Sequence, residues 1–194
     1  MYKYKFLIFF LTVILFGCAQ DSPKIEKGKI DPKDPLDMLG VDFAKKLKVK
    51  LQFYYMNNQD TLDEVTLIKE KNDLRVIING HIFELDSAKP VKSTRYIIED
   101  LASVVNSYPH LDIRVYGHSG KDGTDKERQD LSDNRAIAVA QILYELDNKN
   151  DTLAKGCSDR KPLFAIDSDE HIISNGRVEI FFYIDSKKAK DQCR

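Results

Sequence analysis

Hydrophobic and polar residues alternate between positions 47 and 55, where leucine, valine or an aromatic residue takes every second position. A period of two is typical of a strand with one buried face. The polar run 56–60 has the composition of a turn, and a weaker extended run follows at 61–69. The pattern predicts a small β-hairpin, which we assign to residues 41–72.

The following hundred residues switch repeatedly between extended and helical patterns. Extended runs fall at 74–83, 113–117, 162–166 and 178–184, and amphipathic helical stripes fall at 95–107 and 136–146. Ser132 stands where the N-cap of the second helix is expected, after a charged loop. The order β-α-β-α-β-β over residues 73–185 predicts an α+β, two-layer sandwich, with two helices on one face of a mixed sheet.

The N-terminal 40 residues have a different character. Two lysines precede an apolar run at 6–17 that is too short to span a bilayer but suits a secretory signal, so residues 1–17 are predicted to be a signal peptide. Residues 18–40 contain three prolines and few large apolar groups, which favours a flexible tether. The C-terminal tail, 186–194, is polar.

Cysteine 18 ends the tetrapeptide Leu-Phe-Gly-Cys, which resembles the lipobox of bacterial lipoproteins. The resemblance implies cleavage before Cys18 and attachment of lipid, including palmitate, to that residue. In such lipoproteins, a residue other than aspartate directly after the lipidated cysteine goes with sorting to the outer membrane, and Ala19 fits that rule. The alternative is an ordinary secretory signal followed by an incidental cysteine.

Composition narrows the classes of function. The chain has 30 basic and 31 acidic residues, which gives no reason to expect a nucleic-acid surface. It contains no nucleophile elbow, no HExxH and no P-loop, so we predict neither an enzyme nor a metal or cofactor site. In an exported chain, Cys157 and Cys193 form either a disulfide or two free thiols, and the sequence leaves both open.

Short motifs in the predicted sandwich resemble those of the OmpA-like C-terminal domain family, of the peptidoglycan-associated lipoprotein type. They are FELDSA at 83–88, GHSGKDG at 117–123, LSDNRA at 131–136, GCSDRKP at 156–162 and NGRVE at 175–179. Their order and spacing agree with the family. The resemblance implies non-covalent binding of peptidoglycan through the diaminopimelate of its stem peptide, a zwitterion that requires both a cationic donor and an acceptor.

The resemblance also implies the binding residues. Arg135 matches the family arginine, expected here in the first turn of its helix, and Asp86, Ser119 and Arg177 fit their motifs. The family aspartate is replaced by Gly120, and Asp122, two residues on, is the candidate substitute. Arg128 and Gly176 also depart from the pattern, so three polar contacts of the family pocket are missing.

Two functions follow as expectations. The first is an outer-membrane lipoprotein, anchored in lipid through Cys18, whose periplasmic domain binds peptidoglycan and links envelope layers. The alternative is a structural lipoprotein subunit of an envelope-spanning machine, such as a type IVB (Dot/Icm-like) secretion system or a flagellar stator assembly. In that case binding to peptidoglycan is weak or lost.

Overall fold

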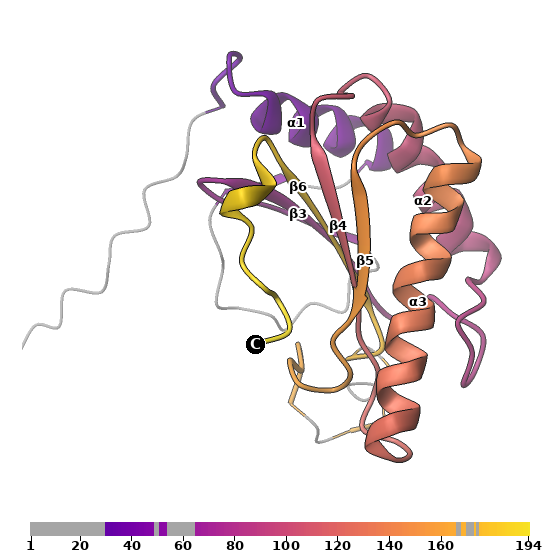
Figure 1. The fold of residues 1–194 in the computed structure, drawn as a ribbon. Helices are drawn as coiled ribbons and strands as arrows, with labels where there is room; N and C mark the ends of the chain where they lie inside the picture. Colours follow the sequence, from indigo (N-terminus) through magenta and orange to yellow (C-terminus); the bar gives the residue numbers. More distant parts are fainter. Residues whose placement is uncertain (1–29, 49–50, 54–64, 166–167, 170–172, 174) are drawn as a thin grey trace, which may run out of the picture.

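The computed structural model describes residues 30–48, 51–53, 65–165, 168–169, 173 and 175–194 (Figure 1). The predicted signal peptide, the predicted lipidation site Cys18 and the predicted turn at 56–60 lie outside these ranges. Within them, no helix combines the length and the hydrophobicity that crossing a membrane requires.

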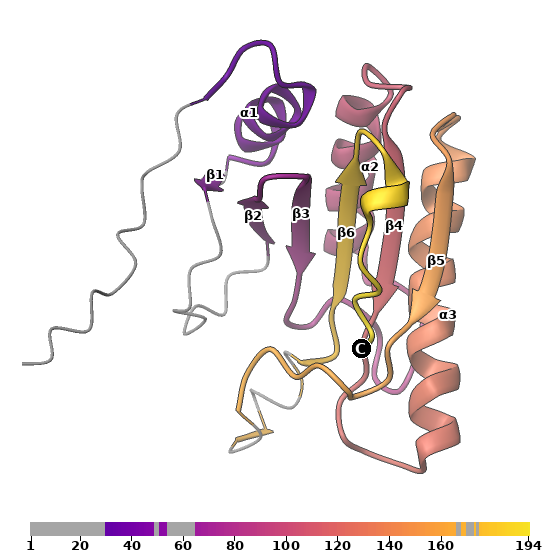
Figure 2. The same ribbon diagram turned by 60° about the vertical axis from the view of Figure 1, so that its left-hand side comes forward.

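Six strands form one mixed sheet, in the spatial order β1–β2–β3–β6–β4–β5 (Figure 2). Their bounds are β1 Leu51–Phe53, β2 Val65–Lys69, β3 Asp73–Ile78, β4 Asp112–Gly117, β5 Thr152–Gly156 and β6 Val178–Tyr183. The last strand lies between β3 and β4 and is antiparallel to both. Because β6 is central and covered on both faces, all six of its residues are buried.

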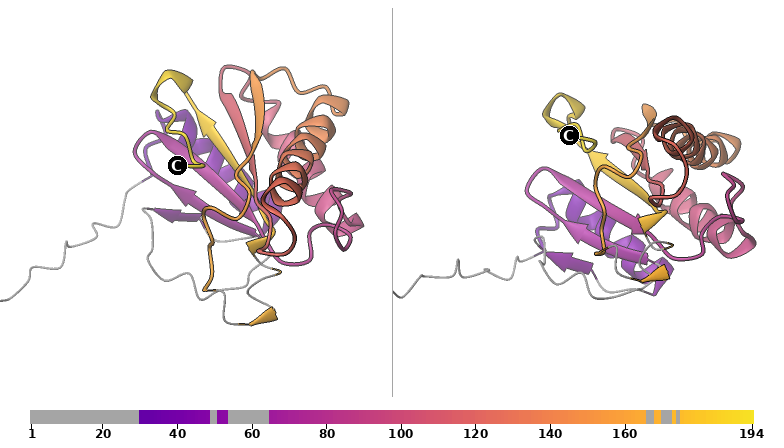
Figure 3. Two further views of the ribbon diagram at one scale, coloured as in Figure 1. Left: turned by 60° about the horizontal axis from the view of Figure 1, so that its bottom comes forward. Right: turned by 90° about the horizontal axis from the view of Figure 1, so that it is seen from below.

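Three helices pack on one face of this sheet: α1 Pro35–Leu47, α2 Lys92–Val105 and α3 Asp125–Glu145 (Figure 3). Their apolar stripes meet alternate residues of the strands, among them Val76, Ile113 and Ile180, in a single core. From residue 73 onward the order of elements is β-α-β-α-β-β, so the predicted α+β sandwich is confirmed.

The C-terminal segment covers part of the other face. Tyr116, Phe181 and Tyr183 form a second apolar cluster there, with the Phe181 and Tyr183 rings stacked at 6.1 Å. A disulfide joins Cys157 to Cys193, with their Cα atoms 4.7 Å apart, and so resolves the alternative that the sequence left open. The predicted polar tail therefore contains a buried cysteine and a short 3-10 helix, Ser186–Lys188.

The N-terminal prediction was wrong over the described residues. The tether was expected to extend to residue 40, but α1 begins at Pro35, and Leu36, Leu39 and Phe43 are buried in the core. Proline is compatible with the first helical position, and the Asp34 side chain accepts a hydrogen bond from the backbone N–H of Leu36 at 2.8 Å. Pro35 thus starts a helix here.

The predicted β-hairpin within 41–72 was also wrong. Leu47, the first residue of the expected strand, ends α1, and β1 pairs with β2 in parallel, whereas a hairpin requires antiparallel strands. Ion pairs hold β2 to the start of α1, since the buried Nζ of Lys69 lies 3.4 Å from a carboxylate oxygen of Asp34 and 3.3 Å from one of Asp37. The extension is therefore a helix and two strands built into the domain.

Two further boundaries differ from the sequence predictions. The fifth strand is Thr152–Gly156, whereas residues 162–165 form a loop, because the N–H groups of Leu163 and Phe164 donate to the Asn175 side chain and not to a strand. The third helix begins at Asp125, where Thr124 and Glu127 form a capping box. Ser132 is consequently a buried residue inside α3 and not its N-cap.

The packing of α1 leads to a stability prediction. Phe43 is fully buried, and its ring centroid lies 5.2 Å from that of Phe182. Phe43→Ala should lower the free energy of unfolding by about 3–5 kcal/mol, as measured by urea denaturation. The control Tyr144→Ala removes a ring that is 80% exposed and should change it by less than about 0.5 kcal/mol. Equal effects would mean that α1 is not part of the core.

Candidate functional site

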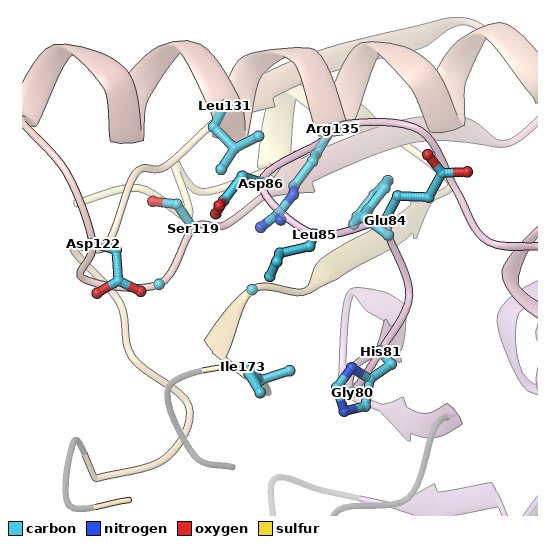
Figure 4. A pocket seen from close by; sticks show the side chains of 13 residues that line it. Gly80, His81, Glu84, Leu85, Asp86, Ser119, Asp122, Leu131, Arg135 and Ile173 are labelled. Carbon is cyan, nitrogen blue, oxygen red and sulfur yellow. The ribbon is translucent and has the colours of Figure 1, made fainter. Parts of the chain in front are cut away.

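A cavity of about 170 Å³ opens beside the ends of β3 and β4, against α3 and the segment that precedes β6 (Figure 4). The strands β3 and β4 both run antiparallel to β6, so the loops that follow them emerge at the same edge of the sheet. The lining residues are Gly80, His81, Phe83, Glu84, Leu85, Asp86, Ser119, Gly120, Asp122, Leu131, Arg135, Ile173 and Gly176.

Arg135 reaches the cavity from α3 and is only 8% exposed. Its Nε donates to the Ser87 carbonyl at 3.1 Å and its Nη1 donates to the His118 carbonyl at 3.2 Å. The guanidinium carbon lies 4.9 Å from the centre of the Phe83 ring, a cation–π contact. Burial lowers the pKa of Arg135 to about 10, and the carboxylate of Asp86 acts in the opposite direction.

Three candidate acceptors line the cavity together with this guanidinium, and Figure 4 shows Asp86 nearer to it than Ser119 or Asp122. Asp86 and Asp122 are exposed carboxylates on the loops after β3 and β4, respectively. Asp86 has a φ of +48°, in the left-handed region that aspartate enters more readily than most residues. The Ser119 hydroxyl is buried and has no hydrogen-bond partner among the described residues. A buried polar atom without a partner is costly, so a ligand that bonds it would gain affinity.

Close backbone approach holds these loops in place. A Cβ at Gly117 would lie 2.1 Å from the Ser132 carbonyl oxygen, so only glycine allows α3 to pack against the end of β4. The backbone N–H of Ser119 donates to the Ser158 carbonyl at 3.1 Å, and Ser158 adjoins the disulfide-bonded Cys157. The hydroxyl of Ser132 accepts a hydrogen bond from the N–H of Ser158 at 2.9 Å. Ser132, the serine of the LSDNRA motif, thus holds Ser158, which in turn positions Ser119 in the lining of the cavity.

Two arginines of the motif region point elsewhere. Arg177 is buried outside the lining, and its Nε donates to Glu179 at 2.8 Å. Arg128 lies at the start of α3, with its Nε 3.1 Å from Asp159 and its Nη2 paired with Asp125. Both arginines tie loops to the sheet or helix, and neither lines the cavity.

The structure therefore brings together four of the five predicted binding residues: Asp86, Ser119, Asp122 and Arg135. It places Arg177 apart from them. The expectation that Arg135 lies in the first turn of its helix was wrong, because α3 begins ten residues earlier, at Asp125. Sequence reasoning missed the apolar part of the lining, including Leu85 and Ile173, since loop residues carry no period. Phe83 and Leu85 were both visible as members of the FELDSA motif, but neither was singled out as a lining residue.

Beneath the cavity, the side chain of His118 is buried beside an ionic cluster. Its Nε2 lies 3.6 Å from Glu179, which also pairs with Arg75 and Arg177. Burial, reinforced by Arg177, lowers the pKa of His118 to about 3, against the opposing effect of Glu179. Burial alone would raise the pKa of Glu179, but Arg177 and its neighbours lower it. The pair is therefore a neutral imidazole beside a carboxylate at pH 7.

The lining of the cavity suits the binding of a small polar group. It combines one cation, several acceptors and apolar walls in a volume suited to a small polar group. In the part of the chain that the structure describes, no three histidine, cysteine, aspartate or glutamate side chains are grouped so that they could hold a metal ion.

Comparison with known proteins supports the α+β sandwich fold described above. The model of the OmpA family matches residues 82–175. The uncharacterized protein YtxE of Bacillus subtilis is 27% identical over 181 residues, which cover 90% of this chain and 72% of YtxE. The periplasmic domain of Helicobacter pylori MotB is 25% identical, with a TM-score of 0.55 over 61% of this chain and 87% of that domain. The cell wall anchor of the type VI secretion system from Pseudomonas aeruginosa is 23% identical, with a TM-score of 0.59, over 75% of this chain and 96% of the anchor.

The buried imidazole predicts a pH dependence of stability. His118 has a folded pKa near 3 and an ordinary value of 6.5, so between these values the unfolded chain binds a proton that the folded chain does not. Stability should fall by on the order of 1 kcal/mol per pH unit as the pH drops through this window. His118→Gln should reduce this loss between pH 7 and pH 5 in urea titrations. The exposed-site control His110→Gln should retain the full loss, and equal slopes for both variants would contradict the assignment.

Proposed function

Because residues 82–175 form an OmpA family domain, we propose that this chain binds peptidoglycan non-covalently and thereby holds a membrane-attached N-terminus to the cell wall. The observation that carries the proposal is the cavity itself, which is lined by one buried guanidinium, two exposed carboxylates and a hydroxyl that has no hydrogen-bond partner among the described residues. The MotB domain and the type VI anchor, to which the fold is similar, are named as periplasmic and cell-wall-anchoring proteins.

The proposed ligand is the diaminopimelate of the stem peptide. Its free end carries an ammonium and a carboxyl group on one carbon. The ammonium would lie between Asp86 and Asp122, where the net charge favours a cation. The carboxyl oxygen would accept a hydrogen bond from Arg135, and the hydroxyl of Ser119 would complete the site. Asp122 thus supplies the acceptor that Gly120 lacks.

We also propose that the chain is an outer-membrane lipoprotein, attached through lipid on Cys18. The support is the Leu-Phe-Gly-Cys sequence after a short apolar run. Several acyl chains contribute about 0.8 kcal/mol per buried methylene, which is enough for firm anchoring. The stretch from residue 19 to Asp34 would then separate the lipid from the domain.

The alternative function, a structural subunit of an envelope-spanning machine, is favoured by a different surface. Ile137 and Tyr144 lie two turns apart on α3 and are 52% and 80% exposed. Two large apolar side chains on one outer helix face suit contact with another protein. In this alternative, contacts of this helix face with other proteins hold the chain in place, and the cavity does not.

Retention on purified sacculi tests the cavity. The wild-type chain should pellet with sacculi, and Arg135→Lys should reduce its affinity at least roughly tenfold, since lysine keeps the charge but loses the planar donors. Arg128→Lys is the matched control, because it makes the same change on the same helix outside the lining, and it should behave as the wild type. Circular dichroism checks that both variants fold.

The same experiment separates the two functions. Recovery of the wild-type chain only at the level of a control without sacculi would contradict wall binding. Recovery in a stoichiometric protein assembly that survives digestion of the wall would favour the subunit of a machine.

Lipidation is tested by growing cells with labelled palmitate. The wild-type chain should take up label and fractionate with membranes, whereas Cys18→Ser should do neither, because the thiol that accepts lipid is gone. Cys193→Ser, which removes a cysteine that is bonded to Cys157, should keep the label. Labelling of the Cys18→Ser chain would contradict the anchor.

A further inference from the structure

The lining of the cavity carries more acid than base. Three carboxylates, Glu84, Asp86 and Asp122, line it together with a single cation, Arg135. Glu84 is compensated by Lys89, whose Nζ lies 2.6 Å from its Oε1. Even without Glu84, two carboxylates stand against one guanidinium. Such a cavity attracts an ammonium and opposes the entry of a carboxylate.

The guanidinium has little capacity left for a carboxylate. Its Nε and Nη1 already donate to the carbonyls of Ser87 and His118. A Cβ at Gly176 would lie 2.8 Å from Nη1, so the backbone at Gly176 lies against that atom. Among the described residues, Nη2 donates to no acceptor. A forked contact combines N–H groups of two neighbouring nitrogens, and Nη2, whose two N–H groups are unengaged in the described part of the chain, has as neighbours only Nε and Nη1, each of which already donates to a carbonyl.

The counter-charge of Arg135 is also already present. Asp86 acts electrostatically on the guanidinium, and Asp122 lines the same cavity. A second anion is therefore not required to balance the cation. An N–H of Nη2 can donate to a carboxylate oxygen or to the carbonyl oxygen of an amide. The carboxylate bond is the stronger one, but only the amide forms its bond without adding a negative charge beside Asp86 and Asp122. The amide adds two N–H donors, which suit the neighbouring carboxylates and the unpartnered Ser119 hydroxyl.

We propose that the cavity prefers stem peptides whose diaminopimelate is amidated, with a carboxamide beside the ammonium in place of the free carboxylate, and binds them more tightly than the free acid. This inference rests on the proposed function, since it names the ligand class of the same cavity. The ammonium lies between Asp86 and Asp122, and the amide oxygen faces Nη2 of Arg135.

Isothermal titration of the purified chain with two muropeptides tests the proposal. They are disaccharide tripeptides that differ only in a carboxylate or a carboxamide at this carbon. We expect the amidated form to bind about 2- to 5-fold more tightly at low salt, the scale of one solvent-exposed charge contact. The difference should shrink at high salt, because screening acts on the repulsion.

The outcomes separate the inference from the function on which it rests. Equal binding of the two muropeptides, or tighter binding of the free acid, would overturn the inference and leave wall binding standing. Absence of binding by both muropeptides would overturn both.

A matched pair of variants tests the cause. Asp122→Asn removes one carboxylate from the lining and should reduce the preference for the amide. Asp130→Asn makes the same change at an exposed position of α3 outside the lining and should leave the preference unchanged. An undiminished preference in Asp122→Asn would show that the acidic lining is not its source, and would overturn the argument.

Discussion

The site depends on one buried cation. Arg135 ties three segments together, because it extends from α3, donates to the carbonyl of Ser87 after β3 and donates to the carbonyl of His118 after β4. Taking a guanidinium out of water is costly unless its donors are satisfied. The two carbonyls and the Phe83 ring meet that need and fix the shape of the loops. The cavity is therefore a consequence of how this charge is stabilised.

The rest of the fold brings α3 close enough for this contact. Glycines at 117 and 156 allow the helix backbone to approach β4 and β5, where any Cβ would collide with the residues around Ser132 and Asp133. On the opposite face of the sheet, the Cys157–Cys193 disulfide holds the C-terminal segment over the aromatic cluster and adjoins the Ser158 carbonyl that positions Ser119. Arg177, which the family resemblance suggested as a binding residue, and Ser132, which was expected to cap a helix, thus both have structural roles inside the domain.

Much of the fold could be predicted from periodicity. The strands β3, β4 and β6 and the helix α2 have one clean period each, so their place in the chain was found to within a few residues. Periodicity did not locate the boundaries of elements where a short strand directly follows a helix or where a helix begins with charged residues. The alternation from Leu47 to Tyr55 was interpreted as a single strand, but α1 ends at Leu47 and β1 begins only at Leu51. The charged start of α3 was interpreted as loop, although Thr124 and Glu127 form a capping box. The edge strand β5 is half exposed, which left little apolar signal.

The site was found through motif resemblance, and only its polar members were found. Asp86, Ser119, Asp122 and Arg135 meet in space although up to 49 residues separate them in the chain, and no local pattern predicts that meeting. Leu85, which is 89% exposed, lines the cavity because its loop turns sharply at Asp86, a geometry that the sequence does not show.

The most direct test of the central claim is nuclear magnetic resonance of the arginine side chains. The account predicts that the Nε–H of Arg135 exchanges slowly with water in the free chain, because the Ser87 carbonyl accepts it, and that its signal shifts when a diaminopimelate muropeptide is added. The Nε–H of Arg177, which is bonded to Glu179 away from the cavity, should be slow to exchange but should not shift. An Arg135 signal that exchanges as fast as those of exposed arginines, or that stays unchanged when the muropeptide binds, would contradict the account.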